Sequence, residues 1–122
     1  MHALMAARAH AEIRVIVVFH GFAFLPAGAQ PGAEPYDLAE GVNVPMLVLH
    51  GTEDERAPMA DMRRMEARMR ALGRVCAFTF YAGARHGFAV RTHPGYAEDA
   101  AKRSFDEAKR FLTTHLPVAG RE

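Results

Sequence analysis

Three histidine-glycine pairs and one aspartate are the residues of this sequence whose types and spacing best suit chemistry. They are His20-Gly21, His50-Gly51, His86-Gly87 and Asp54. Each pair ends an apolar run, or follows shortly after one, that has the pattern of a buried strand. Because the carboxyl ends of parallel strands meet at one edge of a sheet, we expect these histidines and Asp54 to lie near one another.

The order of Asp54 and His86 favours hydrolase chemistry. An aspartate after one strand and a histidine after the next are the acid and base of a catalytic triad, in the order in which they follow the nucleophile in α/β-hydrolases. In such a triad the histidine takes the proton of the nucleophile, while the carboxylate fixes the imidazole tautomer and stabilises its charged form. The alternative is that Asp54 only caps a turn or a helix.

A metal site built on the three histidines is a further alternative. Glycine after histidine also marks a tight turn or a close backbone approach, which explains the pairs without any ligand. The 122 residues contain neither an HExxH motif nor a Cys/His finger pattern. We therefore expect no metal and no cofactor.

The elements that must position these residues alternate between strand and helix. Strands are expected at Ile13–Phe19, at the apolar run after Pro45 and at Val75–Tyr81; helices are expected over residues 1–10, from Pro58 to Gly73 and from Tyr96 to about Leu116. Residues 22–43 read as a long surface loop. The second helix carries a methionine stripe, Met62, Met65 and Met69, and the last carries Ala101, Phe105 and Ala108 at helical spacing, so both faces should pack in the core.

This order predicts an α/β fold with a three-stranded, mostly parallel sheet flanked by helices. Residues 1–122 are expected to form a single domain. The 15 basic and 14 acidic residues are interspersed and leave a formal net charge of +1, which gives no footprint for nucleic acid or for a membrane surface. One apolar stretch, residues 15–25, imitates a secretory signal, but charged and turn residues interrupt it. With one cysteine, Cys76, the composition suits a cytoplasmic protein.

The strings LHGTEDERAP and YAGARHGF, with IRVIVVFHG before them and a helix start after them, resemble the C-terminal half of the dienelactone hydrolase family of α/β-hydrolases. The resemblance covers nearly the whole chain except residues 22–43. It implies half of an α/β-hydrolase fold and hydrolysis of small-molecule esters or lactones, with Asp54 as the triad acid and His86 as the base. Arg91 lies near the place where some members hold a substrate carboxylate, and an ordinary solvated arginine is the alternative.

The departure from that family concerns the nucleophile. The 122 residues contain no GxSxG or GxCxG elbow; Ser104 falls in the last expected helix and Cys76 in the third expected strand. Met1 falls about where the elbow would end. We therefore expect a chain that is inactive alone, with an open edge on the Ile13–Phe19 strand that a second copy or a partner chain covers. The alternative is a non-catalytic oligomerisation or binding module derived from a hydrolase.

Overall fold

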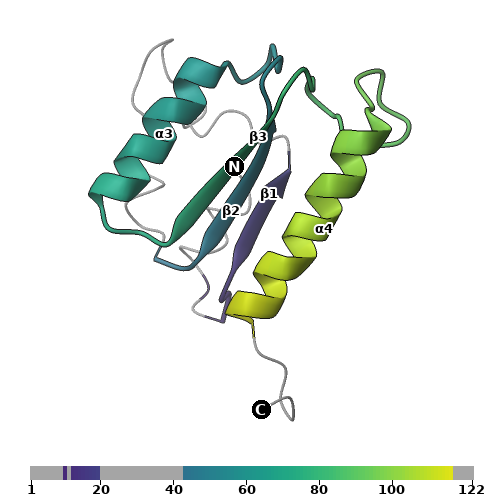
Figure 1. Ribbon diagram of the computed structural model, residues 1–122. Coiled ribbons are helices and arrows are strands. Elements are labelled where there is room, and N and C mark those ends of the chain that lie inside the picture. Colours follow the sequence, from purple (N-terminus) through teal and green to yellow (C-terminus); the bar gives the residue numbers. More distant parts are fainter. Residues whose placement is uncertain (1–9, 11, 20–42, 117–122) are drawn as a thin grey trace.

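The computed structural model describes residues 10, 12–19 and 43–116 (Figure 1). Within these ranges the elements are β1 (Ile16–Phe19), β2 (Met46–Gly51), α3 (Met59–Ala71), β3 (Cys76–Tyr81) and α4 (Glu98–His115). Their order and bounds agree with the sequence prediction to within three residues at each end. The helix predicted over residues 1–10, the loop over residues 22–43 and the pair His20-Gly21 lie outside the described residues, except for His10 and Asn43.

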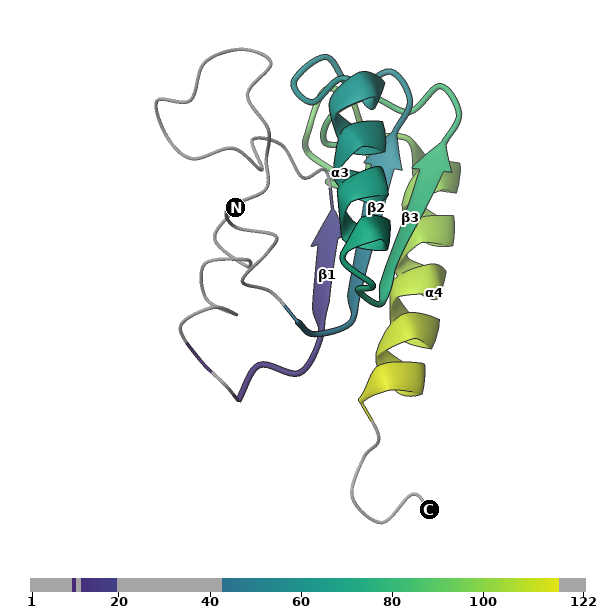
Figure 2. The same ribbon diagram turned by 90° about the vertical axis from the view of Figure 1, so that its left-hand side faces the viewer.

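The three strands form one parallel sheet in the order β1-β2-β3. Ile16 is level with Met46, and Met46 is level with Cys76, so the strands begin together. Figure 2 shows the three arrowheads at the same end of the sheet. The three-stranded parallel sheet predicted from the sequence is therefore confirmed, and the loops that leave β2 and β3 emerge side by side.

The first strand is shorter than predicted, because its pairing ends at a proline. The N–H of Ile16 donates to the carbonyl of Pro45 at 2.9 Å. The ring of Pro45 leaves no N–H with which to extend the ladder further. β1 thus begins at Ile16 and not at Ile13.

Helices α3 and α4 cover opposite faces of the sheet (Figures 1 and 2). Side chains of the central strand alternate between the two layers: Met46 and Val48 pack toward α3, and Leu47 and Leu49 pack toward the α4 side. All four are at most 1% exposed. A continuous apolar run of this kind is typical of a parallel strand buried on both faces.

The methionine stripe of α3 lies in the core, as predicted. Met62, Met65 and Met69 are 2%, 0% and 0% exposed and pack with Ile16, Met46 and Val48. Their burial ties the helix that follows Asp54 to the sheet. The loop between β2 and α3 is thus fixed at both of its ends.

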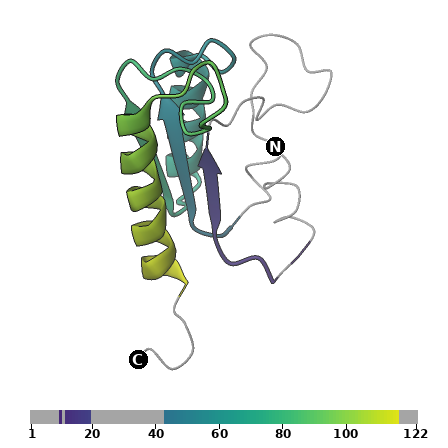
Figure 3. The same cartoon turned by 90° about the vertical axis from the view of Figure 1, so that its right-hand side faces the viewer.

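The packing of α4 differs from the prediction at Phe105. The residues that α4 buries are small, Ala100, Ala101, Ser104 and Ala108, which lets the helix lie close to the sheet. Phe105 instead points toward the β1 side, where its ring lies 5.2 Å from that of Phe19 and 49% of the residue remains exposed. Figure 3 shows β1 at the margin of the sheet. Neither α3 nor α4 is long and apolar enough to cross a membrane, and this finding concerns the described residues alone.

Candidate active site

The loop after β2 buries Asp54 and fixes one of its two carboxylate oxygens. Oδ1 accepts hydrogen bonds from the backbone N–H of Arg56 at 2.8 Å and of Ala57 at 2.9 Å. The residue is 4% exposed. Asp54 therefore does cap the turn that leads into α3, and it does so with Oδ1 alone.

The other oxygen faces a histidine from the neighbouring loop. His86, in the loop after β3, places its Nδ1 2.9 Å from Asp54 Oδ2, and their side chains are 15% and 1% exposed. A carboxylate can only accept, so Nδ1 carries the hydrogen. In the neutral ring the lone pair is then on Nε2, the nitrogen with which a general base acts. The structure thus brings Asp54 and His86 together in the arrangement of an acid and a base.

Backbone contacts clamp the two loops to each other. The N–H of Glu53 donates to the carbonyl of Ala84 at 2.9 Å, and the N–H of Gly83 donates to Thr52 Oγ1 at 2.8 Å. Gly51 lies so close that a Cβ there would be 2.2 Å from the carbonyl oxygen of Ala84. The glycine of the His50-Gly51 pair is therefore required by the close approach of the loop after β3.

Replacing Gly51 with alanine is expected to lower the free energy of unfolding by about 3 kcal/mol, because the new Cβ meets backbone that is itself hydrogen-bonded. The matched control is Gly83→Ala, which has a φ of 77° but open space around its Cβ. That variant should cost about 1 kcal/mol, from backbone strain alone. Urea unfolding of both variants measures the difference, and equal losses would refute the contact as the cause.

A second histidine, His93, stabilises the loop that carries His86. Its Nδ1 accepts the N–H of Gly95 at 2.9 Å, and its ring lies 5.9 Å from the ring of His86. Gly87 has a φ of 80°, and a Cβ there would lie 2.4 Å from the His93 ring. Sequence reasoning missed His93; the Gly and Pro residues around it marked a tight loop but not which side chain fills it.

Among the described residues, His50 and His86 do not form a metal site. His20 lies outside the described residues, and His50 is 0% exposed, with Nε2 3.7 Å from Asp54 Oδ2. Over residues 10, 12–19 and 43–116, no group of three histidine, cysteine, aspartate or glutamate side chains is arranged to hold a metal ion.

The other predicted candidate, Arg91, lies on the same loop as His86, five residues further along, and is exposed. Ser104 and Cys76 are poorly suited to act as nucleophiles. Ser104 is 0% exposed, and its Oγ donates to the carbonyl of Ala101 at 2.8 Å. Burial, helped by the negative charge of Glu66, raises the pKa of the Cys76 thiol to about 12, so the reactive thiolate is scarce at neutral pH.

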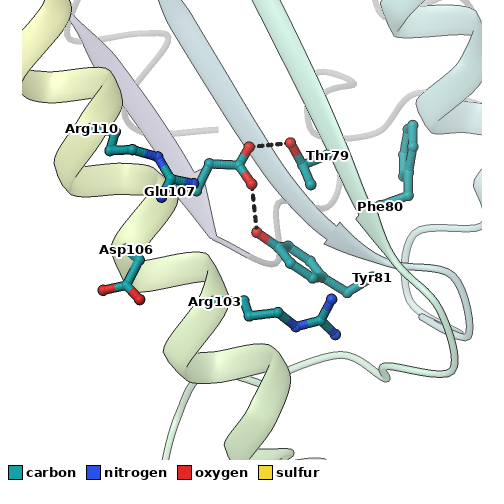
Figure 4. Close-up of a pocket in the computed structure, with 7 residues that line it drawn as sticks. All are labelled: Thr79, Phe80, Tyr81, Arg103, Asp106, Glu107 and Arg110. Carbon is teal, nitrogen blue, oxygen red and sulfur yellow. Dashed lines mark hydrogen bonds between the residues drawn. The ribbon is translucent and has the colours of Figure 1, made fainter.

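A pocket of about 260 Å³ lies elsewhere, between β3 and α4 (Figure 4). Its lining includes Glu107, which accepts hydrogen bonds from the hydroxyls of Tyr81, at 3.0 Å, and of Thr79. Burial, and then the hydrogen bond and charge of Glu107, raise the pKa of Tyr81 above its usual range. The pocket is lined by neither Asp54 nor His86, so it is not part of the acid-base arrangement.

Comparisons with known proteins agree on one family. The model of the dienelactone hydrolase family matches residues 1–116. A protein of Methylorubrum extorquens named "Putative carboxymethylenebutenolidase" is 30% identical over 103 residues, which cover 81% of this chain and 35% of that protein. A protein of the same name from Salmonella typhimurium is 27% identical over 111 residues, covering 91% and 40%. The chain thus spans about two fifths of the length of these relatives.

Solved structures show the same fold. A "Putative Dienelactone Hydrolase" from Klebsiella pneumoniae matches with a TM-score of 0.79 at 22% identity, over 91% of this chain and 46% of that one. Esterase 2 of Thermogutta terrifontis, phosphorylated by paraoxon, matches with a TM-score of 0.64 at 22% identity, over 89% and 43%. These neighbours confirm the predicted fold, which is part of an α/β-hydrolase fold. The chain covers a little under half of each of these two structures.

Proposed function

The chain belongs to the dienelactone hydrolase family, and from this premise we propose that it supplies the acid, Asp54, and the base, His86, of a hydrolase active site. The substrates are small-molecule esters or lactones. The nucleophile and the oxyanion-hole donors come from residues outside the 122 of this sequence, so the chain alone is inactive. No metal or cofactor takes part in this proposal.

One observation carries the proposal: the 2.9 Å contact between Asp54 Oδ2 and His86 Nδ1. The two residues come from loops after neighbouring parallel strands, the edge of an α/β sheet where catalytic groups collect. Asp54 is buried, and its other oxygen is fully occupied by two backbone amides. A carboxylate held in this way can orient one imidazole and stabilise its positive charge.

The proposed reaction is transfer of the acyl group to the nucleophile, followed by hydrolysis. His86 Nε2 takes the proton of the nucleophile as the oxygen or sulfur of the nucleophile attacks the carbonyl carbon. When the C–O bond of the ester breaks, His86 gives that proton to the departing alkoxide. In the second stage His86 takes a proton from water as the water attacks the acyl group. It then gives that proton to the departing nucleophile, and the acid is released. Asp54 stays ionised throughout.

Hydrolysis of p-nitrophenyl acetate tests the proposal. Three samples are compared: this chain, the part of a family member that carries a nucleophile elbow, and both together. We expect the mixture to exceed the sum of the separate rates by about 10³-fold, because a triad works as a unit. A mixture no faster than its separate parts would count against the proposal.

Arg91 is proposed to bind the carboxylate of an anionic substrate, since it is exposed and shares a loop with the base. Arg91→Ala in the same mixture should raise the KM for an ester that carries a carboxylate by about tenfold, the effect of losing one charged hydrogen bond, and leave kcat unchanged. The control is p-nitrophenyl acetate, whose KM should not change. An unchanged KM for the anionic ester would indicate that Arg91 does not bind the substrate and is an ordinary solvated side chain.

A second candidate function is a non-catalytic oligomerisation module, and it is favoured by the margin of the sheet at β1. Beside that strand, Phe105 of α4 contacts Phe19 and is 49% exposed. Within the residues that the structure describes, no strand pairs with the outer edge of β1, and an open strand edge beside an apolar side chain invites pairing with a second chain. We propose that a second copy or a partner chain covers it. A monomer in sedimentation at micromolar concentration, with no partner present, would argue against a second copy.

A further inference from the structure

His50 is the part of the histidine-glycine pattern that the proposed acid-base pair leaves unexplained. It is the second-last residue of the strand β2, and none of its surface is exposed. Phe80, on β3, meets its ring edge-on at 88°, with 6.5 Å between the centroids. A histidine in such surroundings must find hydrogen-bond partners for both ring nitrogens within the protein, because bulk water does not reach them.

The hydrogen bond of His50 fixes its tautomer. Its Nε2 lies 2.7 Å from the carbonyl oxygen of Ala57. A carbonyl oxygen can only accept, so Nε2 carries the hydrogen, and in the neutral ring Nδ1 is an acceptor. Nδ1 is buried and has no hydrogen-bond partner within the part of the chain that the structure describes. For packing alone, an apolar residue would serve this position better than a histidine.

Ala57 makes one hydrogen bond with His50 and another with Asp54. Ala57 accepts from His50 through its carbonyl, and its own N–H donates to Asp54 Oδ1 at 2.9 Å. The same Nε2 of His50 is 3.7 Å from Asp54 Oδ2, the oxygen that faces His86. Seen from Asp54, one histidine lies on the exposed side of the carboxylate and another behind it, in the core.

We propose that His50 is a positioning residue for Asp54. Its Nε2–H holds the turn of residues 54–57 in place from inside the sheet. The backbone amides of Arg56 and Ala57 then keep their hydrogen bonds to Oδ1, and Oδ2 stays directed at His86. The inference rests on the proposed function for the use of the Asp54–His86 pair, but it is tested without any hydrolysis.

The test is long-range ¹H–¹⁵N NMR of the full chain, which reports the tautomer of each histidine, together with the exchange of the His86 Nδ1 hydrogen with water. In His50→Leu that exchange should become about tenfold faster, the effect of losing one hydrogen bond. The melting temperature should fall, because the buried carbonyl of Ala57 loses its donor. In His50→Gln the amide can still donate to Ala57, and the exchange should stay close to the wild-type rate.

Three outcomes would overturn the inference. One is a folded His50→Leu protein whose His86 hydrogen exchanges at the wild-type rate. Another is equal acceleration in the Gln and Leu variants, which would assign the effect to ring packing. If neither variant folds, the wild-type spectrum decides: His50 found with its hydrogen on Nδ1, or with both nitrogens protonated, contradicts the proposed hydrogen bond. Hydrolysis that fails in the reconstituted mixture would overturn the proposed function and leave this result standing.

Discussion

Replacing His86 with alanine is expected to lower kcat of the reconstituted hydrolase by about 10⁶-fold, close to the loss of the whole catalytic triad. Without the imidazole, nothing takes the proton of the nucleophile or returns it to the leaving group. His86 is only partly buried, so the variant should fold normally. The circular dichroism spectrum and the melting temperature check this.

The matched control for that experiment is His115→Ala. His115 ends α4, where its ring lies tilted against that of Phe111, with 4.3 Å between the centroids, and it belongs to neither the loop of Asp54 nor the loop of His86. Its removal should leave kcat unchanged. A rate within about tenfold of wild type in His86→Ala would exceed what a triad without its base retains, and would exclude His86 as the base.

Replacing Asp54 with asparagine is expected to lower kcat by about 10⁴-fold while the turn survives. The amide oxygen of asparagine can still accept the two backbone N–H groups that now bind Oδ1. Its NH₂ group would then face His86, and it can only donate. The imidazole must then present a lone pair on Nδ1, which puts its hydrogen on Nε2 and disables the base.

The control for the second experiment is Asp61→Asn. Asp61 lies in the first turn of α3 and pairs with Arg64 at 2.6 Å, so it is a second aspartate with a defined partner outside the site. Kinetics of p-nitrophenyl acetate hydrolysis by both variants gives the comparison. Equal activity of Asp54→Asn and Asp61→Asn would reduce Asp54 to a turn cap.

The proximity of Asp54 and His86 could be predicted from the sequence because parallel strands impose a simple geometry. Once the runs before His50 and His86 are identified as neighbouring parallel strands, the loops after them must emerge at one edge. The chain order of Asp54 and His86 then favours a triad over other uses. The sequence left open whether Asp54 is a cap or an acid. In the structure Oδ1 accepts hydrogen bonds from two backbone amides of the turn, while Oδ2 faces His86.

The contacts by which His50 and His93 support Asp54 and His86 could not be predicted. They depend on how the loops fold in three dimensions, which sequence patterns do not indicate. His50 was visible as part of a pattern, yet its hydrogen bond to Ala57 depends on how the loop folds back over the strand end. His93 fills a space above Gly87 that exists only in the closed loop. Periodicity placed Phe105 on an apolar face, but periodicity does not say whether anything covers that face.

Covalent labelling shows which polypeptide supplies the nucleophile. The chain is mixed with the serine elbow of a family member, treated with a fluorophosphonate, and each polypeptide is weighed by mass spectrometry. We expect the label on the elbow polypeptide only when the wild-type chain is present, and we expect it to be lost with His86→Ala. Label on Ser104 of this chain, or labelling that does not depend on His86, would contradict this expectation.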